Sequence, residues 1–277
     1  MATINDNRNA MTVADYIIDQ ELKGRSMTTL IELKQAFPDA KNGHIATAIK
    51  RLVLAGEVFS PCNGFYVKIP VAYKLHGKVP PFFYIDELMK YLKRPYYVGL
   101  LSAASVLGAG HQRAMRDYVV ASGARLHLPR LKKAALEFAY RSEIIDSATF
   151  VRNGEGGTIR FSNAALTAFD LVRFHSICGG LSNVATVIAE LKEQLDFNQS
   201  PELLRKIGIV DAQRLGYLLE YPLEDKRLAD MLYEGLKGCG RRMTVRLLDQ
   251  HSPANTLDSG SNRWKIMPNV EVEVEDV

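Results

Sequence analysis

The segment from Thr28 to Lys68 constrains the fold of this chain most strongly, because it joins a helical repeat to a hairpin signal. Apolar residues recur in it at the i, i+3, i+4, i+7, i+8 spacing of one buried helical face: Ile45, Ala48, Ile49, Leu52 and Val53. Gly56 is expected to end this helix as a left-handed cap. Two β-rich runs, Glu57–Ser60 and Phe65–Lys68, then flank the turn-forming Pro61-Cys62-Asn63-Gly64. The segment therefore predicts a helix followed by a two-stranded hairpin.

Two earlier helices are expected to support this one. Thr12 is placed to cap a helix over Val13–Lys23, which Gly24-Arg25-Ser26 interrupts. The next helix carries Leu30, Leu33 and Phe37 on one face and ends before Pro38, because the residue before a proline disfavours helix. Helix, turn, amphipathic helix and hairpin together predict a winged helix-turn-helix. In that motif the second helix, the recognition helix, enters the major groove of DNA, and the hairpin, or wing, contacts phosphates.

The distribution of charge favours a nucleic-acid partner for this segment. Residues 1–40 hold four Lys/Arg against six Asp/Glu, whereas residues 41–95 hold nine against three. The positive charge thus begins where the predicted recognition helix begins, as phosphate binding requires. The alternative is a protein-interaction module whose charged faces are only solvated.

The predicted DNA-binding residues divide by their position in the motif. Polar residues at the front of the recognition helix are expected to reach base edges: Asn42, His44 and Thr47. The cations placed for phosphates are Lys41, Lys50, Arg51 and Lys68. Asn63 at the tip of the wing and Thr28 at the start of the segment complete the set.

Length and composition exclude several classes of protein. A chain of 277 residues, 47% apolar and 24% charged with a net charge of +4, is globular and long enough for two domains. Three cysteines without a CxxC pair and six scattered histidines indicate neither a disulfide framework nor a metal site, and no cofactor is expected. No apolar run approaches the roughly 20 residues that span a bilayer, and the first residues lack the apolar core of a signal peptide. A cytoplasmic protein without membrane contact is expected.

A second informative segment runs from Tyr96 to Gly108, where Ser102 is expected to cap a short helix. Its Tyr-Tyr-Val-Gly and Ser-Ala-Ala motifs, with Gly64-Phe65-Tyr66 at the wing, resemble the AbiEi-type antitoxins of bacterial abortive-infection (type IV toxin–antitoxin) systems. The resemblance implies an N-terminal domain that binds inverted repeats in the promoter of its own operon. It also implies a C-terminal domain that counteracts a toxin of the nucleotidyltransferase class, by direct binding or indirectly.

The rest of the chain reads as a mixed α/β half. The connection Ile69–Pro81 is expected to be extended, and a helix is expected over Tyr84–Lys93. Strands are predicted at Asp117–Val120, Leu136–Tyr140, Ala148–Arg152 and Thr158–Phe161. Helices are predicted at Ala164–Arg173, Leu181–Leu195, Pro201–Ile207, Asp211–Glu220 and Asp225–Leu236. Late strands at Met243–Leu248 and Arg263–Met267 are expected to rejoin the sheet, with Trp264 as a packing anchor.

Basic residues concentrate a second time around the first of these strands: Arg113, Arg116, Arg125, Arg130, Lys132 and Lys133. Three interpretations stay open: an extension of the DNA-binding surface, a contact with an acidic partner, or a solvated face.

Enzymatic activity is not predicted. Gly154–Gly157 lacks the Gly-Lys-Ser/Thr of a phosphate loop and is expected to be a hairpin turn. Toxins of the nucleotidyltransferase class carry Gly-Gly/Ser followed by an Asp-x-Asp/Glu pair that binds metal. Here Gly179-Gly180 is followed by Asp196-Phe197-Asn198, in which the second carboxylate needed for two-metal phosphoryl transfer is missing. No Ser/His/Asp or Cys/His arrangement can be assembled from neighbouring residues.

Together these features predict an α+β protein with an N-terminal winged helix-turn-helix domain and a larger, helix-rich α/β C-terminal domain. The expected divisions are residues 1–70, a connecting segment 71–95, and an antitoxin domain 96–277. The predicted function is that of an antitoxin and transcriptional autorepressor in phage defence, a monomer in solution or a dimer on double-stranded DNA. The alternative is a ligand-responsive winged-helix regulator unrelated to a toxin.

Overall fold

The computed structural model describes residues 11–75, 79–110, 116–128, 131, 136–198, 201–254 and 261–275. Within these ranges the chain combines helices with β-sheets, which confirms the predicted α+β class. Two compact units can be distinguished. Unit 1 comprises Met1–Lys93, Leu126–Ala134 and Gly154–Gly157, and unit 2 comprises Arg94–Arg125, Ala135–Asn153 and Thr158–Val277. The division at residues 70 and 95 stays a prediction.

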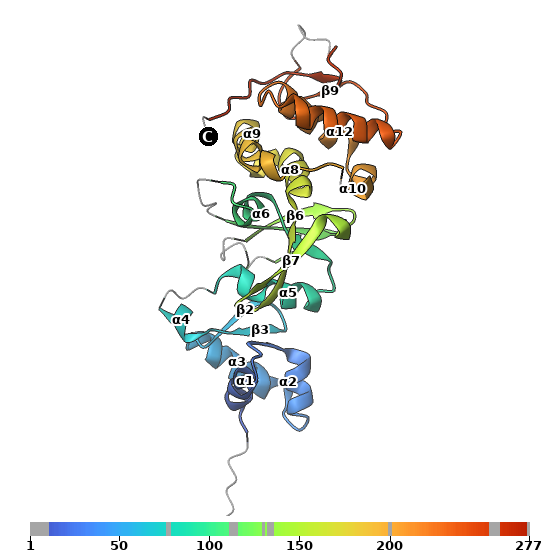
Figure 1. Cartoon of the computed structure of the whole chain (residues 1–277). Coiled ribbons are helices and arrows are strands. Elements are labelled where there is room, and N and C mark those ends of the chain that lie inside the picture. Colours follow the sequence, from blue (N-terminus) through green and yellow to red (C-terminus); the bar gives the residue numbers. More distant parts are fainter. Residues whose placement is uncertain are drawn as a thin grey trace, which may run out of the picture. The chain divides into compact units, whose positions relative to one another are not determined.

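Unit 1 begins with three helices and a small sheet, drawn in blue shades in Figure 1. The helices are α1 (Val13–Leu22), α2 (Leu30–Ala36) and α3 (Asn42–Leu54), and the strands are β1 (Met27–Thr29), β2 (Val58–Cys62) and β3 (Phe65–Lys68). Strand β3 is central and pairs antiparallel with both neighbours, with Thr28 opposite Tyr66 and Phe59 opposite Val67. Sequence periodicity does not reveal β1, because three residues are too few to show an alternating pattern.

Reciprocal side-chain caps determine where α1 and α2 begin. The Thr12 hydroxyl accepts from the N–H of Asp15, whose carboxylate accepts from the N–H of Thr12 at 3.0 Å, and Thr29 and Glu32 repeat this arrangement at α2. Behind these caps, apolar side chains of the three helices form one core. The prediction that Val53 lies on the buried face of α3 is wrong, because its side chain is 42% exposed. It lies about 80° around the helix from Ile45, at the edge of the apolar stripe.

Two more helices follow the hairpin: α4 (Val71–Lys74) and α5 (Pro81–Tyr91). The expectation of an extended connection over Ile69–Pro81 is therefore wrong at α4, where one helical turn follows Pro70. Helix α5 begins at Pro81 rather than at the predicted Tyr84, because proline at the first helical position needs no partner for an N–H. The Tyr91 hydroxyl donates to the carbonyl of Asn63 at 3.0 Å and so ties α5 to the β2–β3 turn.

Unit 2 is built on a five-stranded sheet with the order β6-β5-β4-β8-β7. The strands are β4 (Tyr96–Val98), β5 (Asp117–Ser122), β6 (Leu136–Arg141), β7 (Thr149–Gly154) and β8 (Gly157–Ser162). Four of them confirm predicted strands, and the hairpin turn between β7 and β8 is also confirmed. Strand β4 was not expected. It is buried throughout and runs parallel to β8 and antiparallel to β5, so its three residues show no alternation.

The helix after β4 is α6 (Leu100–Val106). The prediction that Ser102 caps this helix is wrong, because Gly99 is the cap and Ser102 lies inside the first turn. The Ser102 hydroxyl instead accepts from the backbone N–H of Tyr118 at 2.9 Å, in the neighbouring strand β5. The side chain thus joins helix to sheet.

Helices dominate the remainder of unit 2, and most begin or end within three residues of the predicted positions. They are α8 (Ala164–Arg173), α9 (Gly180–Leu191), α10 (Pro201–Lys206), α11 (Ile209–Glu220) and α12 (Lys226–Gly238). The short strands β9 (Arg246–Leu247) and β10 (Ile266–Met267) form a separate parallel pair, near α12 in Figure 1. The expectation that they rejoin the five-stranded sheet is therefore wrong.

Trp264 is a packing anchor, as predicted, since it is fully buried and its ring meets Tyr233 edge-on at 5.5 Å between centroids. Its indole N–H donates to the Glu220 carboxylate at 2.6 Å. The ring lies against Gly216 in α11, where an added Cβ would come within 2.2 Å of a ring atom. A glycine in mid-helix thus makes room for the indole.

We expect Gly216→Ala to lower the free energy of unfolding by about 1–3 kcal/mol, because overpacking outweighs the better helix propensity of alanine. Urea unfolding followed by circular dichroism measures the change. Gly238→Ala is the control, since no atom lies within 4 Å of the added methyl group. Equal stability of the two variants would contradict the role given to Gly216.

Candidate functional site

The outer face of α3 carries cations and hydrogen-bond donors without a carboxylate. Helix α3 contains no acidic residue. The residues on it or at its N-cap that are predicted to bind DNA, and whose side chains are described, are exposed: Lys41, His44, Thr47, Lys50 and Arg51. The backbone of Asn42 begins the helix, but its side chain lies outside the described residues. The buried stripe of Ile45 and Ile49 fixes this orientation, because it turns the polar positions outward.

The three other residues of unit 1 that are predicted to bind DNA lie outside α3. Asn63 is exposed at the β2–β3 turn. Thr28 is buried in β1, and the Lys68 side chain is only 11% exposed because its ammonium group pairs with the Glu57 carboxylate. Glu57 also pairs with Lys74 at 2.5 Å. The structure therefore presents Lys41, His44, Thr47, Lys50, Arg51 and Asn63 to solvent, buries Thr28, and holds the ammonium group of the half-buried Lys68 in an ion pair.

The Glu57 cluster gives unit 1 a pH dependence with a definite sign. Hydrogen bonds from Lys68 and then Lys74 lower the pKa of Glu57 from the ordinary 4.5 to about 2. A carboxyl group whose pKa is lower in the folded chain than in the unfolded chain stabilises the fold at pH values above its unfolded pKa. This stabilisation is lost as the pH falls from about 4.5 towards 2. Solvent reaches both pairs, which keeps the contribution small.

Glu57→Gln is expected to lower the free energy of unfolding at pH 7 by about 0.5 kcal/mol. The difference from the native chain should shrink as the pH falls below about 4.5. Urea unfolding at several pH values tests this, with Asp39→Asn, at an exposed carboxylate in the same unit, as control. A difference that grows towards acidic pH would show the opposite linkage.

A groove of ≈ 840 Å³ lies between α3 and the β2–β3 hairpin. Its α3 wall consists of Ala46, Ile49, Lys50, Val53 and Leu54. Leu30 lines it as well, with Phe59, Ser60, Asn63, Gly64 and Tyr66 from the hairpin side. The sequence analysis did not predict this groove. Its signal is the adjacent pair Val53 and Leu54 at the end of α3, because neighbouring residues of a helix point about 100° apart and cannot both lie on one buried face.

Unit 2 contains a buried polar network between its sheet and α8. Asp170 in α8 has no exposed surface and accepts two hydrogen bonds of 2.6 Å, from the Tyr97 hydroxyl and from Nε of Arg141. Burial raises the pKa of Asp170, while Arg141 and the Tyr97 hydroxyl oppose this effect. Burial, with the Asp170 carboxylate, also raises the pKa of Tyr97, which keeps its hydroxyl a neutral donor. A carboxylate within the apolar helix Ala164–Arg173 was the signal that sequence reasoning overlooked.

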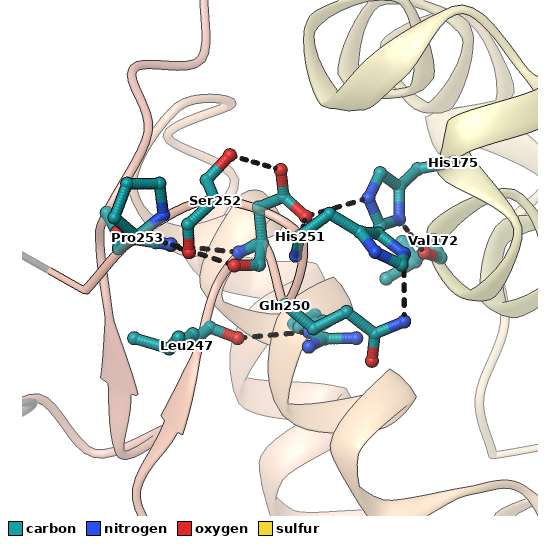
Figure 2. Close-up of polar contacts among 10 residues, drawn as sticks. Val172, His175, Leu247, Gln250, His251, Ser252 and Pro253 are labelled. Carbon is teal, nitrogen blue, oxygen red and sulfur yellow. Dashed lines mark hydrogen bonds and ion pairs between the residues drawn. The ribbon is translucent and has the colours of Figure 1, made fainter.

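Hydrogen bonds bring Asp249 between His175 and Ser252 in unit 2, and Figure 2 labels the latter two side chains. Nδ1 of His175 lies 3.0 Å from the Val172 carbonyl, and Nε2 lies 3.3 Å from the Asp249 carboxylate. The Ser252 hydroxyl donates to the other oxygen of Asp249 at 2.7 Å. The carboxylate therefore stands between serine and imidazole, whereas activation of a serine nucleophile needs the imidazole in the middle. This arrangement fastens the Asp249–Ser252 loop rather than preparing a nucleophile.

Among the described cysteines, Cys178 is the one that is fully buried. Burial raises the pKa of Cys178 to about 12, so this thiol stays protonated. Nowhere in the described ranges do three His, Cys, Asp or Glu side chains gather as metal ligands. None of the described helices has the length and apolarity that crossing a bilayer requires.

The second basic concentration is described only in part. Arg116 pairs with Glu137 at 2.9 Å, and Arg125 is exposed. Arg113, Arg130, Lys132 and Lys133 lie outside the described residues. Whether the six gather into one patch stays a prediction.

Comparison with known proteins identifies the segment that begins at β4. Residues 97–221 match the family described as the AbiEi antitoxin C-terminal domain, which confirms the family that the sequence motifs indicate. No curated protein matches the chain. Among solved structures, the crystal structure of the RV2827C protein from Mycobacterium tuberculosis is similar, with a TM-score of 0.62 and 13% identity. The match covers 91% of this chain and 89% of that one, and at this identity it shows a shared fold.

Proposed function

We propose that this chain, which carries an AbiEi antitoxin C-terminal domain at residues 97–221, is an antitoxin that also represses its own operon. Its C-terminal half neutralises a toxin of the nucleotidyltransferase class. Its N-terminal half binds inverted repeats in double-stranded DNA, as two copies on one palindromic site. The protein acts in the cytoplasm, as part of an abortive-infection defence against phage, and catalyses no reaction.

One observation carries the DNA-binding part of the proposal: the exposed face of α3 holds Lys50, Arg51 and polar side chains, and no carboxylate. Elements α1, β1, α2, α3, β2 and β3 follow one another in the order of a winged helix-turn-helix. In that motif α3 is the recognition helix, and the β2–β3 hairpin is the wing. Its cations are then placed for phosphates, and His44 and Thr47 for base edges.

The antitoxin part rests on the family match and on the residues that shape unit 2. Tyr97 opens the matched segment, and it joins Arg141 and Asp170 in the buried network. The network links β4, β6 and α8, so it keeps the surface of unit 2 in one arrangement. A rigid surface loses little conformational entropy when it binds a partner.

Two experiments test the two parts separately. In a gel shift of the full chain on the DNA upstream of its own gene, sequence-dependent binding that weakens with salt is expected. Co-expression with the neighbouring toxin gene should restore growth, and residues after about Tyr96 should suffice for the rescue. Binding without rescue would leave a repressor that is no antitoxin, and rescue without binding would remove autoregulation.

A second candidate function, ligand-responsive regulation, is favoured by a cavity of ≈ 360 Å³ in unit 2. Among the described residues, four cations line it: Lys237, Arg241, Arg263 and Lys265, beside Tyr233, and Arg263 also pairs with Glu220 and Asp230. Such a lining suits a small anion. A rise in melting temperature with inorganic phosphate or a nucleotide, together with altered DNA affinity, would favour this function. Unchanged DNA affinity would leave the antitoxin proposal in place.

A further inference from the structure

The exposed surface of α3 has two stripes of opposite character. His44, Thr47 and Arg51 follow one another at helical spacing and form a polar stripe. Ala46, Val53 and Leu54 form the other, an apolar stripe into which Lys50 projects between Ala46 and Leu54, and Leu54 is 78% exposed. Exposed apolar side chains that line a common groove mark a binding surface more often than isolated ones do.

The apolar stripe forms one wall of the ≈ 840 Å³ groove, and the hairpin forms the opposite wall. Phe59 and Tyr66 contribute aromatic surface from the hairpin, and Leu30 adds a further apolar side chain. Among the described residues of the lining, Lys50 alone carries a charge. The described lining of the groove is therefore mainly apolar, with one cation.

The charge of α3, which forms one wall of the groove, indicates what occupies it. Lys50 and Arg51 lie on α3 and Lys41 caps it, and neither the helix nor the described lining holds a carboxylate, which complements a polyanion. An apolar lining, however, needs an apolar group on that polyanion. In the major groove of DNA this group is the C5-methyl of thymine, which protein side chains contact through apolar atoms.

We infer that the groove between α3 and the β2–β3 hairpin receives thymine methyl groups, so that this chain selects thymine at the base pairs under Leu54 and Val53. The inference rests on the proposed DNA binding and adds its sequence preference. The polar stripe then reads hydrogen-bonding edges, while the apolar stripe reads methyl groups beside them.

Replacement of thymidine by deoxyuridine tests this inference, because it removes the methyl group and leaves base pairing intact. Single replacements are made across the bound upstream DNA, and dissociation constants are measured by gel shift. At the thymines that enter the groove, affinity should fall about fourfold per methyl group, as for one buried CH₂. Replacements elsewhere should have no effect.

Two variants locate the contact on the protein. Leu54→Gln should bind thymine and uracil equally at the base pair that Leu54 contacts, because the apolar side chain there is lost while charge and helix are kept, and discrimination at a base pair that Val53 contacts should persist. Leu22→Gln, at an equally exposed leucine of α1, should keep the full discrimination. The difference between the variants, measured as a double-mutant cycle with the base, isolates the contact.

Three results would overturn the inference and are distinguishable. Sequence-dependent binding that does not change with uracil at any position would leave the repressor proposal intact, but it would show that no thymine methyl group enters the groove. Absence of sequence-dependent binding would overturn both. Indifference to uracil, with a changed sedimentation coefficient of the free protein in Leu54→Gln alone, would instead assign the groove to a second copy of this chain.

Discussion

Replacement of Asp170 by alanine is expected to lower the free energy of unfolding by about 3–5 kcal/mol, as when one partner of a buried ion pair is removed. The Arg141 side chain is 7% exposed, so its charge would lose its partner without gaining water. Its Nη2 atom already has no hydrogen-bond partner in the described part of the chain, which leaves little alternative bonding. The Tyr97 hydroxyl would lose its acceptor as well.

Urea unfolding of the full chain measures this effect, and co-expression with the toxin gives a second readout. We expect Asp170→Ala to weaken growth rescue, because the fold that carries the proposed antitoxin surface is less populated. Asp146→Ala is the control: it removes an Asp–Arg pair of 3.0 Å that lies on the surface, and it should cost less than about 1 kcal/mol.

Equal stability of Asp170→Ala and Asp146→Ala would contradict the importance of the buried network. A double variant, Asp170→Leu/Arg141→Met, distinguishes the loss of the ion-pair attraction from the cost of leaving the Arg141 charge buried without a partner. We expect it to be more stable than Asp170→Ala, since neither charge is then left buried without a partner.

The charge reversal Lys50→Glu/Arg51→Glu is expected to reduce DNA affinity by at least 100-fold at moderate salt, because attraction to phosphates becomes repulsion. The dependence of log K on log salt should flatten by about two units, one for each phosphate contact removed. Gel shifts across salt concentrations measure both quantities. Because both side chains are exposed, the fold should persist, which circular dichroism can verify.

Lys226→Glu/Arg227→Glu is the matched control for this reversal. It changes an adjacent Lys–Arg pair that is also exposed, at the start of α12 in unit 2, and it alters the net charge by the same amount. If both reversals weaken binding equally, DNA responds to the total charge of the protein and not to α3. If neither does, α3 is not the recognition helix.

Local sequence was sufficient for most of the secondary structure. The pattern of Ile45 and Ile49 predicts α3, Thr12 marks the start of α1, and the apolar run at Ala164–Arg173 predicts α8 with its observed bounds. These signals succeed because a helix is determined by residues three or four positions apart and by its caps. The Tyr96–Gly108 motifs also sufficed to indicate the family.

Features that depend on distant residues escaped prediction. Strands β1 and β4 have three residues each and exist through their pairing with β3, β5 and β8. The sequence predicts Ser102 as a helix cap, but its hydroxyl accepts a hydrogen bond from the backbone N–H of Tyr118 in strand β5. Lys68 reads as a free cation for phosphates, yet β-sheet register brings it to Glu57.

The candidate site divides in the same way between sequence and tertiary structure. Sequence alone determined which helix carries the exposed cations, because helical periodicity separates Lys50 and Arg51 from the buried stripe of Ile45 and Ile49. Only the tertiary structure decided that Leu54 faces a groove and that Asp170 meets Arg141 and Tyr97. Periodicity specifies the direction in which a side chain points from its own helix, whereas the packing of other elements decides what that side chain meets.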